Sequence, residues 1–195
     1  MADIALDKSH TALLIADFYE AMMTTIPHAV ERGVVDRTAA LQRAARDAGI
    51  MVCYCATVFR PGYPEIGGRN KTFGQRKASG QPAVFDPLAV IHPAVTPVEG
   101  EVVVGKHRVN ALYGTGLDVA LRANDIHNLI ILGYATSGVV LSTVRYASDL
   151  DYNLFVVEDC CSDSDTEVHD FLTGRIFPRQ AEVVQSADVI AALAG

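Results

Sequence analysis

ILGYATSGVVLSTVR, residues Ile131–Arg145, is the stretch that decides the fold of this chain. It begins as an apolar run, passes through a turn of small residues and continues with the spacing of a helix. In α/β proteins, a buried strand that leads through such a turn into a helix places the turn at the carboxyl edge of the sheet, where ligands bind. An enzyme could present a nucleophile here, yet the position best suited to carry it is occupied by Val139.

Apolar segments with the length of strands alternate with segments of helical periodicity on both sides of this stretch. We expect strands at Thr11–Ala16, Ile50–Phe59, Glu101–Gly105, Asn128–Gly133, Asn153–Asp159 and near Ala181–Val184. We expect helices at about Val30–Ala48, Gly116–Ala123, Gly138–Asp149 and Ser164–Arg175, and a last one at the C-terminal end. This alternation is typical of a parallel sheet that helices cover on both faces. We therefore predict a Rossmann-like three-layer α/β sandwich, with a mainly parallel sheet of about six strands, as a single domain over residues 1–195.

The composition favours a globular protein with a small-molecule partner. Of 195 residues, 50% are hydrophobic and 20% charged, and the formal net charge is −7. An acidic surface offers no general attraction to nucleic acid or to an anionic membrane. No apolar run approaches the roughly 20 residues of a membrane span, and the first residues lack the pattern of a secretory signal. We therefore expect a cytoplasmic protein that binds a small molecule, and neither nucleic acid nor a membrane.

The cysteines and histidines do not predict a metal site. The four cysteines are Cys53, Cys55, Cys160 and Cys161. Neither pair has C-x-x-C spacing, so we expect buried, reduced thiols. The spacing of the six histidines likewise predicts no metal site, and we expect no cofactor.

Two familiar signatures are incomplete in this chain. GTGLDV (Gly114–Val119) has G-x-G but no third glycine and does not directly follow a strand, which favours a turn and the start of a helix. ATSGV (Ala135–Val139) lacks both glycines of the G-x-S-x-G elbow, which disfavours a serine hydrolase.

Polar residues stand at the ends of three expected strands: Asp17, Lys106 and the turn Gly133–Gly138. Burial would raise the pKa of Asp17 and prepare it to carry a proton, although an aspartate here could equally cap the next loop. Lys106 could pair with that carboxylate or simply reach solvent. The long polar segment 60–100 has the length of a functional lid or binding loop.

Together these pieces resemble the isochorismatase-like hydrolase superfamily, also called the cysteine hydrolases, over nearly the whole chain. In that family an aspartate ends the first strand, a lysine ends a central strand, and a G-x-x-T-x-x-C-V turn presents the nucleophile. Asp17, Lys106 and the turn GYATSGVV (Gly133–Val140) match these features. The resemblance implies a hydrolase, and commonly a dimer or a higher homo-oligomer.

The chain departs from the family pattern at two places. Val139 stands at the nucleophile position, and FYEAMM (Phe18–Met23) replaces the polar residues that usually follow the aspartate. None of the four cysteines can substitute by position, and the zinc-binding D-x-H pattern of some members is absent after the second strand. Amide hydrolysis through a thioester therefore loses its nucleophile.

Isochorismatases proper work without that cysteine, because an aspartic acid protonates a vinyl ether and water attacks the resulting oxocarbenium ion. By this resemblance Asp17 is the expected general acid and Lys106 its electrostatic partner. The expected substrate-binding residues are Tyr134, Thr136, Ser137, Gly138, Val139 and, as an anion contact, Arg60. Two alternatives stay open: an amide or carbamoyl hydrolase using water activated by Asp17, and a catalytically inactive protein that binds a small ligand.

Overall fold

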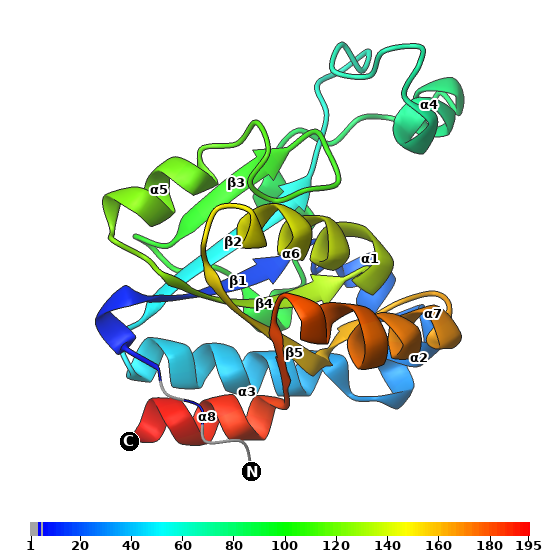
Figure 1. The fold of residues 1–195 in the computed structure, drawn as a ribbon. Helices are drawn as coiled ribbons and strands as arrows, with labels where there is room; N and C mark the ends of the chain where they lie inside the picture. The colour runs from blue at the N-terminus through cyan, green and yellow to red at the C-terminus, as the bar shows by residue number, and fades with distance from the viewer. Residues whose placement is uncertain (1–3, 5) are drawn as a thin grey trace.

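The computed structural model, which describes residue 4 and residues 6–195, has a six-stranded sheet with the order β3-β2-β1-β4-β5-β6 (Figure 1). All five strand pairs are parallel. The strands are β1 (Thr11–Ala16), β2 (Met51–Thr57), β3 (Val102–Lys106), β4 (Asn128–Tyr134), β5 (Asn153–Ser162) and β6 (Glu182–Val184). The predicted α/β fold is confirmed.

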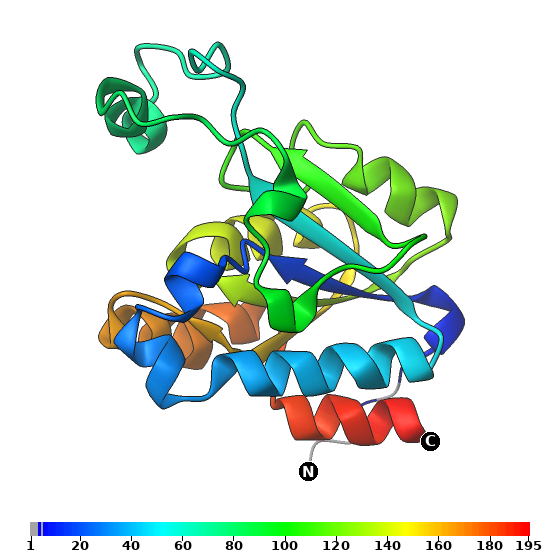
Figure 2. The same ribbon diagram turned by 180° about the vertical axis from the view of Figure 1, so that it is seen from behind.

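Helices cover both faces of the sheet. They are α1 (Glu20–Met23), α2 (Pro27–Glu31), α3 (Val34–Asp47), α4 (Lys71–Ala78), α5 (Leu117–Ala123), α6 (Leu141–Ser148), α7 (Thr166–Phe171) and α8 (Ser186–Ala194). In both views α3 and α8 lie together below the sheet, while α5 and α6 lie above it (Figures 1 and 2). None of the helices in the described part of the chain is both long and apolar enough to cross a membrane.

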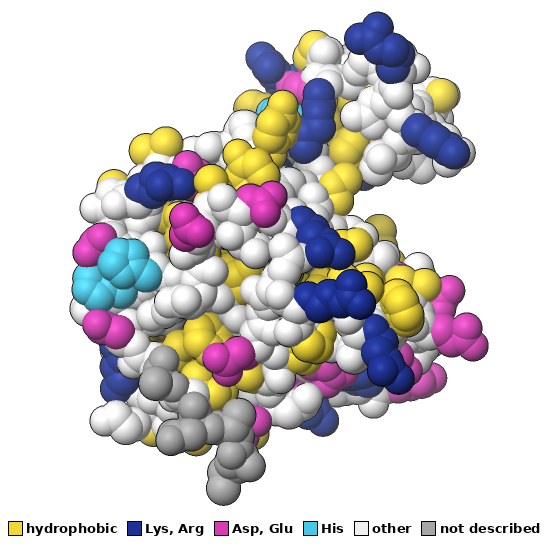
Figure 3. Space-filling view, viewed as in Figure 1, with side chains coloured by type: hydrophobic (Ala, Val, Ile, Leu, Met, Phe, Trp, Pro, Cys, Tyr) yellow, Lys and Arg dark blue, Asp and Glu magenta, His cyan; other side chains and the backbone are white. Residues whose placement is uncertain are grey.

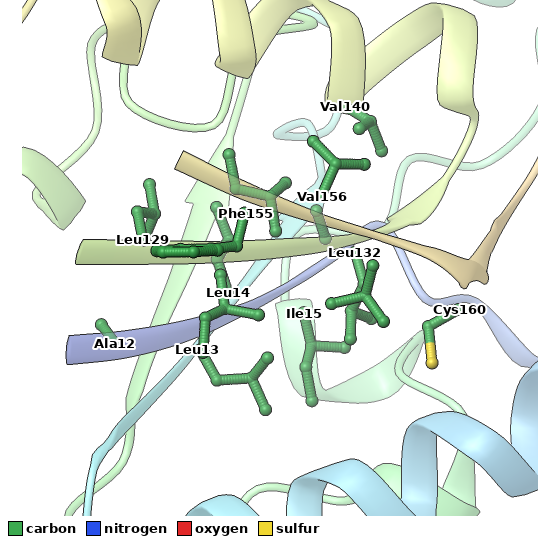
Figure 4. Packing of buried hydrophobic residues seen from close by; sticks show 14 of the residues in the cluster. Ala12, Leu13, Leu14, Ile15, Leu129, Leu132, Val140, Phe155, Val156 and Cys160 are labelled. Carbon is green, nitrogen blue, oxygen red and sulfur yellow. The ribbon is translucent and has the colours of Figure 1, made fainter. Parts of the chain in front are cut away.

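The central strands are buried on both faces. All six residues of β1 are buried, as are the first six of β4, and both strands are almost entirely apolar. Figure 4 shows the side chains of these strands and of β5 packed together on the two sides of the sheet. This explains why the strands read as continuous apolar runs rather than as alternating ones.

The strand order places a topological switch point between β1 and β4. From β1 the chain moves outward through β2 to β3 at one edge, and then returns to add β4 on the other side of β1. Ligands bind in open α/β sheets at the carboxyl ends of the strands beside such a point. Residue Asp17 follows β1 directly, and the Tyr134–Val139 turn begins at the last residue of β4, so both lie at this edge.

Gly133 allows β1 and β4 to approach closely at the switch point. Its φ is +139°, and a Cβ atom built on it would lie 1.9 Å from the carbonyl oxygen of Ala16. Only glycine fits this backbone position, because any side chain would collide with the neighbouring strand.

The helix expected over Ser164–Arg175 is observed as α7 followed by a π-helical turn, Leu172–Ile176, and the structure also differs from the expected helices at two other breaks. The helix expected over Val30–Ala48 is divided into α2 and α3 by Gly33, whose φ is +62°. The helix expected over Gly138–Asp149 begins as a π-helical turn, Thr136–Val140, before α6 proper starts at Leu141. Glycine in the first case and the irregular turn in the second both interrupt regular α-helical hydrogen bonding.

The long polar segment is not structureless, because it contains α4 and two short 3₁₀ turns. We call residues 60–84 the arm. It projects from the carboxyl edge of the sheet beyond β2 and β3 (Figures 1 and 2). Phe59, Tyr63 and Ile66 form a small apolar cluster at its base, separate from the main core.

Candidate active site

Asp17 and Lys106 meet at the carboxyl edge of the sheet. The Nζ atom of Lys106 lies 2.6 Å from Oδ2 of Asp17, and the two residues are 1% and 7% exposed. They come from the ends of β1 and β3, which are separated by β2, so the long lysine side chain spans the end of the intervening strand. A buried charge requires a partner of opposite sign, and each residue supplies it to the other.

Thr57, the last residue of β2, lies between them. Its backbone N–H donates to Oδ1 of Asp17 over 2.8 Å, and its Oγ1 accepts a hydrogen bond from Lys106 Nζ over 2.5 Å. Tyr19 adds a further donor, since its hydroxyl lies 2.5 Å from Oδ1 of Asp17. Hydrogen-bond donors and an adjacent cation favour the ionised form of a carboxyl group over its neutral form. Lys106, Thr57 and Tyr19 thus all direct hydrogen-bond donors at the side chain of Asp17.

Tyr19 is held in its neutral, proton-donating form. Burial and the negative charge of Asp17 raise the pKa of the Tyr19 hydroxyl well above its usual value. The hydroxyl thus keeps its proton for the hydrogen bond to the carboxylate.

The backbone of Asp17 is unusual for a residue other than glycine. Its φ is +48°, in the left-handed region, and its N–H donates to the carbonyl of Cys55 over 2.9 Å. Such conformations persist only where the surrounding structure enforces them, and they gather at functional sites.

A pocket of about 280 Å³ adjoins this cluster. Its lining residues are Tyr19, Glu20, Ala21, Met22, Thr57, Arg76, Val84, Ala89 and Val90. Tyr19 and Thr57 are the two residues that hydrogen-bond to Asp17, and Arg76 reaches the pocket from α4 on the arm. A larger hollow of about 560 Å³ borders Asn128 and Asn153, the first residues of β4 and β5, and so lies at the opposite edge of the sheet.

A second polar network supports the turn after β4. The buried ring of His169, on α7, is 2.8 Å from Oγ1 of Thr136 through Nδ1 and 2.8 Å from Oε1 of Glu158 through Nε2. Glu158 also pairs with Arg32, and the hydrogen bond from His169 is the main cause that lowers the pKa of Glu158 to about 2. The network thus links α7 and β5 to the π-helical turn.

The isochorismatase domain model matches residues 11–188 of the chain. The chain belongs to the isochorismatase family. A probable isochorismatase of Pseudomonas chlororaphis is 30% identical over 97% of this chain and 89% of its own length. The maleamate amidohydrolase of Pseudomonas putida is 28% identical over 92% of this chain and 84% of its own. The structure of an isochorismatase family protein from Burkholderia thailandensis matches with a TM-score of 0.82 and 30% identity, over 98% of each chain.

This isochorismatase-family hydrolase holds the backbone of its β4 turn in internal bonds. The N–H of Ser137 donates to Asp163 Oδ2 over 2.7 Å, and that of Gly138 donates to the carbonyl of Ala135 over 2.9 Å. The side chain of Thr136 is fully buried and bonds to His169 and to the carbonyl of Ser162. Thr136 and these two N–H groups are therefore occupied in shaping the turn, and their substrate contact stays a prediction.

Tyr134 and Val139 lie at the two ends of the same turn. Strand register pairs Ala16 with Gly133, so Tyr134 is the neighbour of Asp17 across the switch point. Val139 is 2% exposed. Neither residue belongs to the set that lines the 280 Å³ pocket among the described parts of the chain.

Arg60 was the expected anion contact, but the structure does not place it in the pocket. Its Nε lies 2.6 Å from Oε1 of Glu65, so its charge is already paired within the arm. Arg76, on α4, is the arginine that lines the pocket. Sequence reasoning did not find Arg76, because α4 must fold back toward α1 before its arginine reaches the pocket.

Sequence reasoning also missed Thr57 and Tyr19. Thr57 had a usable signal, since it ends a strand that lies in the sheet between those of Asp17 and Lys106. Tyr19 lies in Phe18–Met23, the segment that replaces the family's usual polar residues after the aspartate. Its own hydroxyl is a polar group that contacts Asp17.

The cysteines of the chain are buried, free thiols, as predicted. Burial raises the pKa of Cys55 and of Cys160 to about 12, and raises those of Cys53 and Cys161 further. The thiolate is the nucleophilic form of cysteine. None of the four is therefore prepared for nucleophilic attack at neutral pH.

Proposed function

We propose that this chain hydrolyses a small anionic amide or carbamoyl compound with water that Asp17 activates. The observation that carries this proposal is the set of donors around Asp17: Lys106, Thr57 and Tyr19 all stabilise its negative charge. A carboxylate accepts protons, so Asp17 is better arranged as a general base than as the general acid that the sequence alone favoured.

In the proposed reaction, Asp17 takes a proton from water while the water oxygen attacks the carbonyl carbon of the substrate. The carbon–nitrogen bond then breaks, and the proton held by Asp17 passes to the leaving nitrogen. The products are a carboxylate, or a carbamate from a carbamoyl group, and ammonia or an amine. Lys106 stays close to the reacting groups and stabilises the negative charge that develops. Val139, at the family's nucleophile position, has no group that could form a covalent bond to the substrate.

Two observations support an anionic amide as the substrate class. Arg76 gives the pocket a cationic side chain, and only Glu20 among its described lining residues carries the opposite charge. The name of the maleamate amidohydrolase, 28% identical to this chain, describes the hydrolysis of an amide that also carries a carboxylate.

The test is a panel of monoamides of dicarboxylic acids and of carbamoyl compounds, assayed for ammonia release. We expect Asp17→Asn to lower kcat/KM by about 10²- to 10⁴-fold, the usual range for a general base. Arg76→Gln should raise KM for anionic amides with a smaller effect on kcat. Asp118→Asn, at a surface position on α5, is the matched control and should behave as the native chain. Full turnover by Asp17→Asn would overturn the mechanism.

Vinyl-ether hydrolysis is the second candidate, because a probable isochorismatase is 30% identical to this chain. A valine at the nucleophile position also excludes a covalent intermediate with the substrate. Isochorismate in the same panel separates the two reactions. Pyruvate release without ammonia from any amide would replace the first proposal with the second. If ligands raise Tm but none is turned over, a binding protein without catalysis is the better description.

A further inference from the structure

We propose that His10, Asp125 and His127 form a binding site for a divalent transition-metal ion such as Zn²⁺. One ligand atom from each of the three side chains lies within 4.8 Å of the other two. The site lies where β1 and β4 begin, at the opposite edge of the sheet from Asp17 and Lys106. It is therefore separate from the proposed catalytic site and does not depend on the proposed function.

The backbone brings the two histidines together. They immediately precede Thr11 and Asn128, which are paired in the parallel register of β1 and β4. The N–H of His127 donates to the carbonyl of His10 over 2.9 Å, which extends this pairing by one residue. The two rings consequently stack, with centroids 4.8 Å apart and planes inclined by 10°.

The carboxylate of Asp125 contacts both imidazoles, one through each oxygen. Its Oδ2 is 3.3 Å from Nδ1 of His10, and its Oδ1 is 3.0 Å from Nε2 of His127. Bond lengths of 2.0–2.2 Å to zinc put neighbouring ligand atoms of a tetrahedral site about 3.4 Å apart. The two contacts use different oxygens of the carboxylate, and one ligand atom from each residue lies within 4.8 Å of the other two, so side-chain rotations are needed to bring all three to this separation.

The backbone at Asp125 aims the carboxylate toward the histidines. Its φ is +53°, a left-handed conformation that aspartate tolerates better than most residues. Its carbonyl oxygen also accepts a hydrogen bond from Nδ1 of His10 over 2.7 Å, and an ion that binds this nitrogen must displace that bond. The loop before β4 is thereby tied to the residue before β1.

The surrounding charges favour a cation. Oδ2 of Asp7 lies 4.0 Å from Nε2 of His10 and adds a second carboxylate to the cluster. The adjacent hollow also contains Arg122, but its guanidinium is paired with Asp118 over 3.1 Å. Figure 3 shows adjoining histidine side chains with acidic ones around them on the face where these elements lie. The three ligands are partly exposed, so an ion can enter directly and water can complete its coordination.

The ligand set selects the class of metal. Imidazole nitrogen is a preferred ligand of Zn²⁺, Cu²⁺, Ni²⁺ and Fe²⁺, whereas Mg²⁺ and Ca²⁺ prefer oxygen ligands alone. Asp125 and His127 also have D-x-H spacing, which the expectation of no metal site overlooked. That expectation held that the histidines include no H-x-x-x-H or D-x-H grouping, which is wrong for Asp125 and His127, and His10 is far from His127 in sequence.

The test is calorimetric titration of the full chain, without a polyhistidine tag, with ZnCl₂ and separately with MgCl₂. We expect one Zn²⁺ per chain and no Mg²⁺ binding. At a Zn²⁺ concentration about a hundred times Kd, Tm should rise by roughly 5 to 10 °C, because the ion ties together the starts of two central strands.

Variants identify the ligands. His127→Gln and Asp125→Asn should each weaken Zn²⁺ binding by at least about tenfold and remove the rise in Tm. His92→Gln changes a histidine outside the cluster and should bind Zn²⁺ as the native chain does. The proposal is overturned if the native chain does not bind Zn²⁺ below about 1 mM, or if both ligand variants bind it unchanged.

Discussion

At the scale of single residues, the site depends on Asp17 and on the groups that surround it. A buried carboxylate is stable only because Lys106, Thr57 and Tyr19 satisfy it together. The sequence predicted the two charged members from their places at strand ends. The two uncharged members became visible only when the strands were paired.

The turn after β4 makes a prediction for Val139. In Val139→Cys, we expect a new amide hydrolysis that iodoacetamide abolishes, because a thiol beside a helix start is placed for attack. Val140→Cys, at the adjacent buried position, is the control and should give no such activity. Ammonia release before and after alkylation measures the effect. If iodoacetamide lowers the ammonia release of Val139→Cys no more than that of Val140→Cys, the turn does not have the geometry of a nucleophile site.

Gly133 makes a prediction for stability. Gly133→Ala should lower the free energy of unfolding by about 3 kcal/mol or more, since the new Cβ would lie 1.9 Å from the carbonyl oxygen of Ala16. Gly116→Ala is the control, because no atom lies within 4 Å of its Cβ position and its φ is −77°. Urea unfolding compares the two variants with the native chain. Equal losses would contradict the close approach of β1 and β4.

At the scale of elements, α7, β5 and the π-helical turn are joined through His169 and Glu158. Neither residue stood out in the sequence, where Glu158 is one acidic residue near the end of an apolar strand. Their contact requires α7 to pack against the end of β5. Thr136 then receives its orientation from His169, so the shape of the turn depends on an element outside it.

This network predicts how stability changes with pH. The pKa of Glu158 is lowered from 4.5 to about 2 in the folded chain, chiefly by the hydrogen bond from His169. A lowered carboxyl pKa contributes stability above the unfolded value near 4.5, and that contribution is lost as pH falls from about 4.5 toward 2. Allowing for partial solvent exposure, we expect the contribution to be about 2 kcal/mol at pH 7.

Glu158→Gln tests this dependence. The variant should be less stable than the native chain at pH 7 but lose less stability on acidification from pH 5 to pH 3. Glu182→Gln, at an exposed position on β6, is the control and should follow the native profile. Urea unfolding at each pH provides the comparison. If Glu158→Gln loses as much stability on acidification as the native chain, the proposed role of the charge is wrong.

At the scale of the whole molecule, the arm is the part least supported by the core. None of the residues of α4 is buried, whereas α5 buries Leu117 and Leu121. The small cluster of Phe59, Tyr63 and Ile66 and a hydrogen bond from Arg108 to the carbonyl of Glu65 join the arm to the body. Segments with few buried apolar contacts open locally at a lower free energy than the core.

Native-state hydrogen exchange tests this difference. We expect the hydrogen-bonded amides of α4 to exchange at least about a hundredfold faster than those of α5, a helix of similar length on the body. Equal protection of the amides in both helices would show that contacts beyond those in this structure stabilise the arm. A second copy of the chain could make such contacts, since the family resemblance leads us to expect a homo-oligomer. Light scattering of the purified chain would detect the oligomer.

The sequence by itself determined the α/β class, the order of the elements and the positions of Asp17 and Lys106. The class and the order follow from the local periodicity of apolar residues. The two residues follow from the rule that ligands bind at the carboxyl ends of the strands in α/β sheets. The tertiary structure alone decided that β2 lies between β1 and β3, and thus that Thr57 joins the site. It also replaced Arg60 with Arg76 in the pocket and brought His10 beside His127. Each of these contacts joins residues distant in sequence, and strand order and the path of the arm, rather than local pattern, set such contacts.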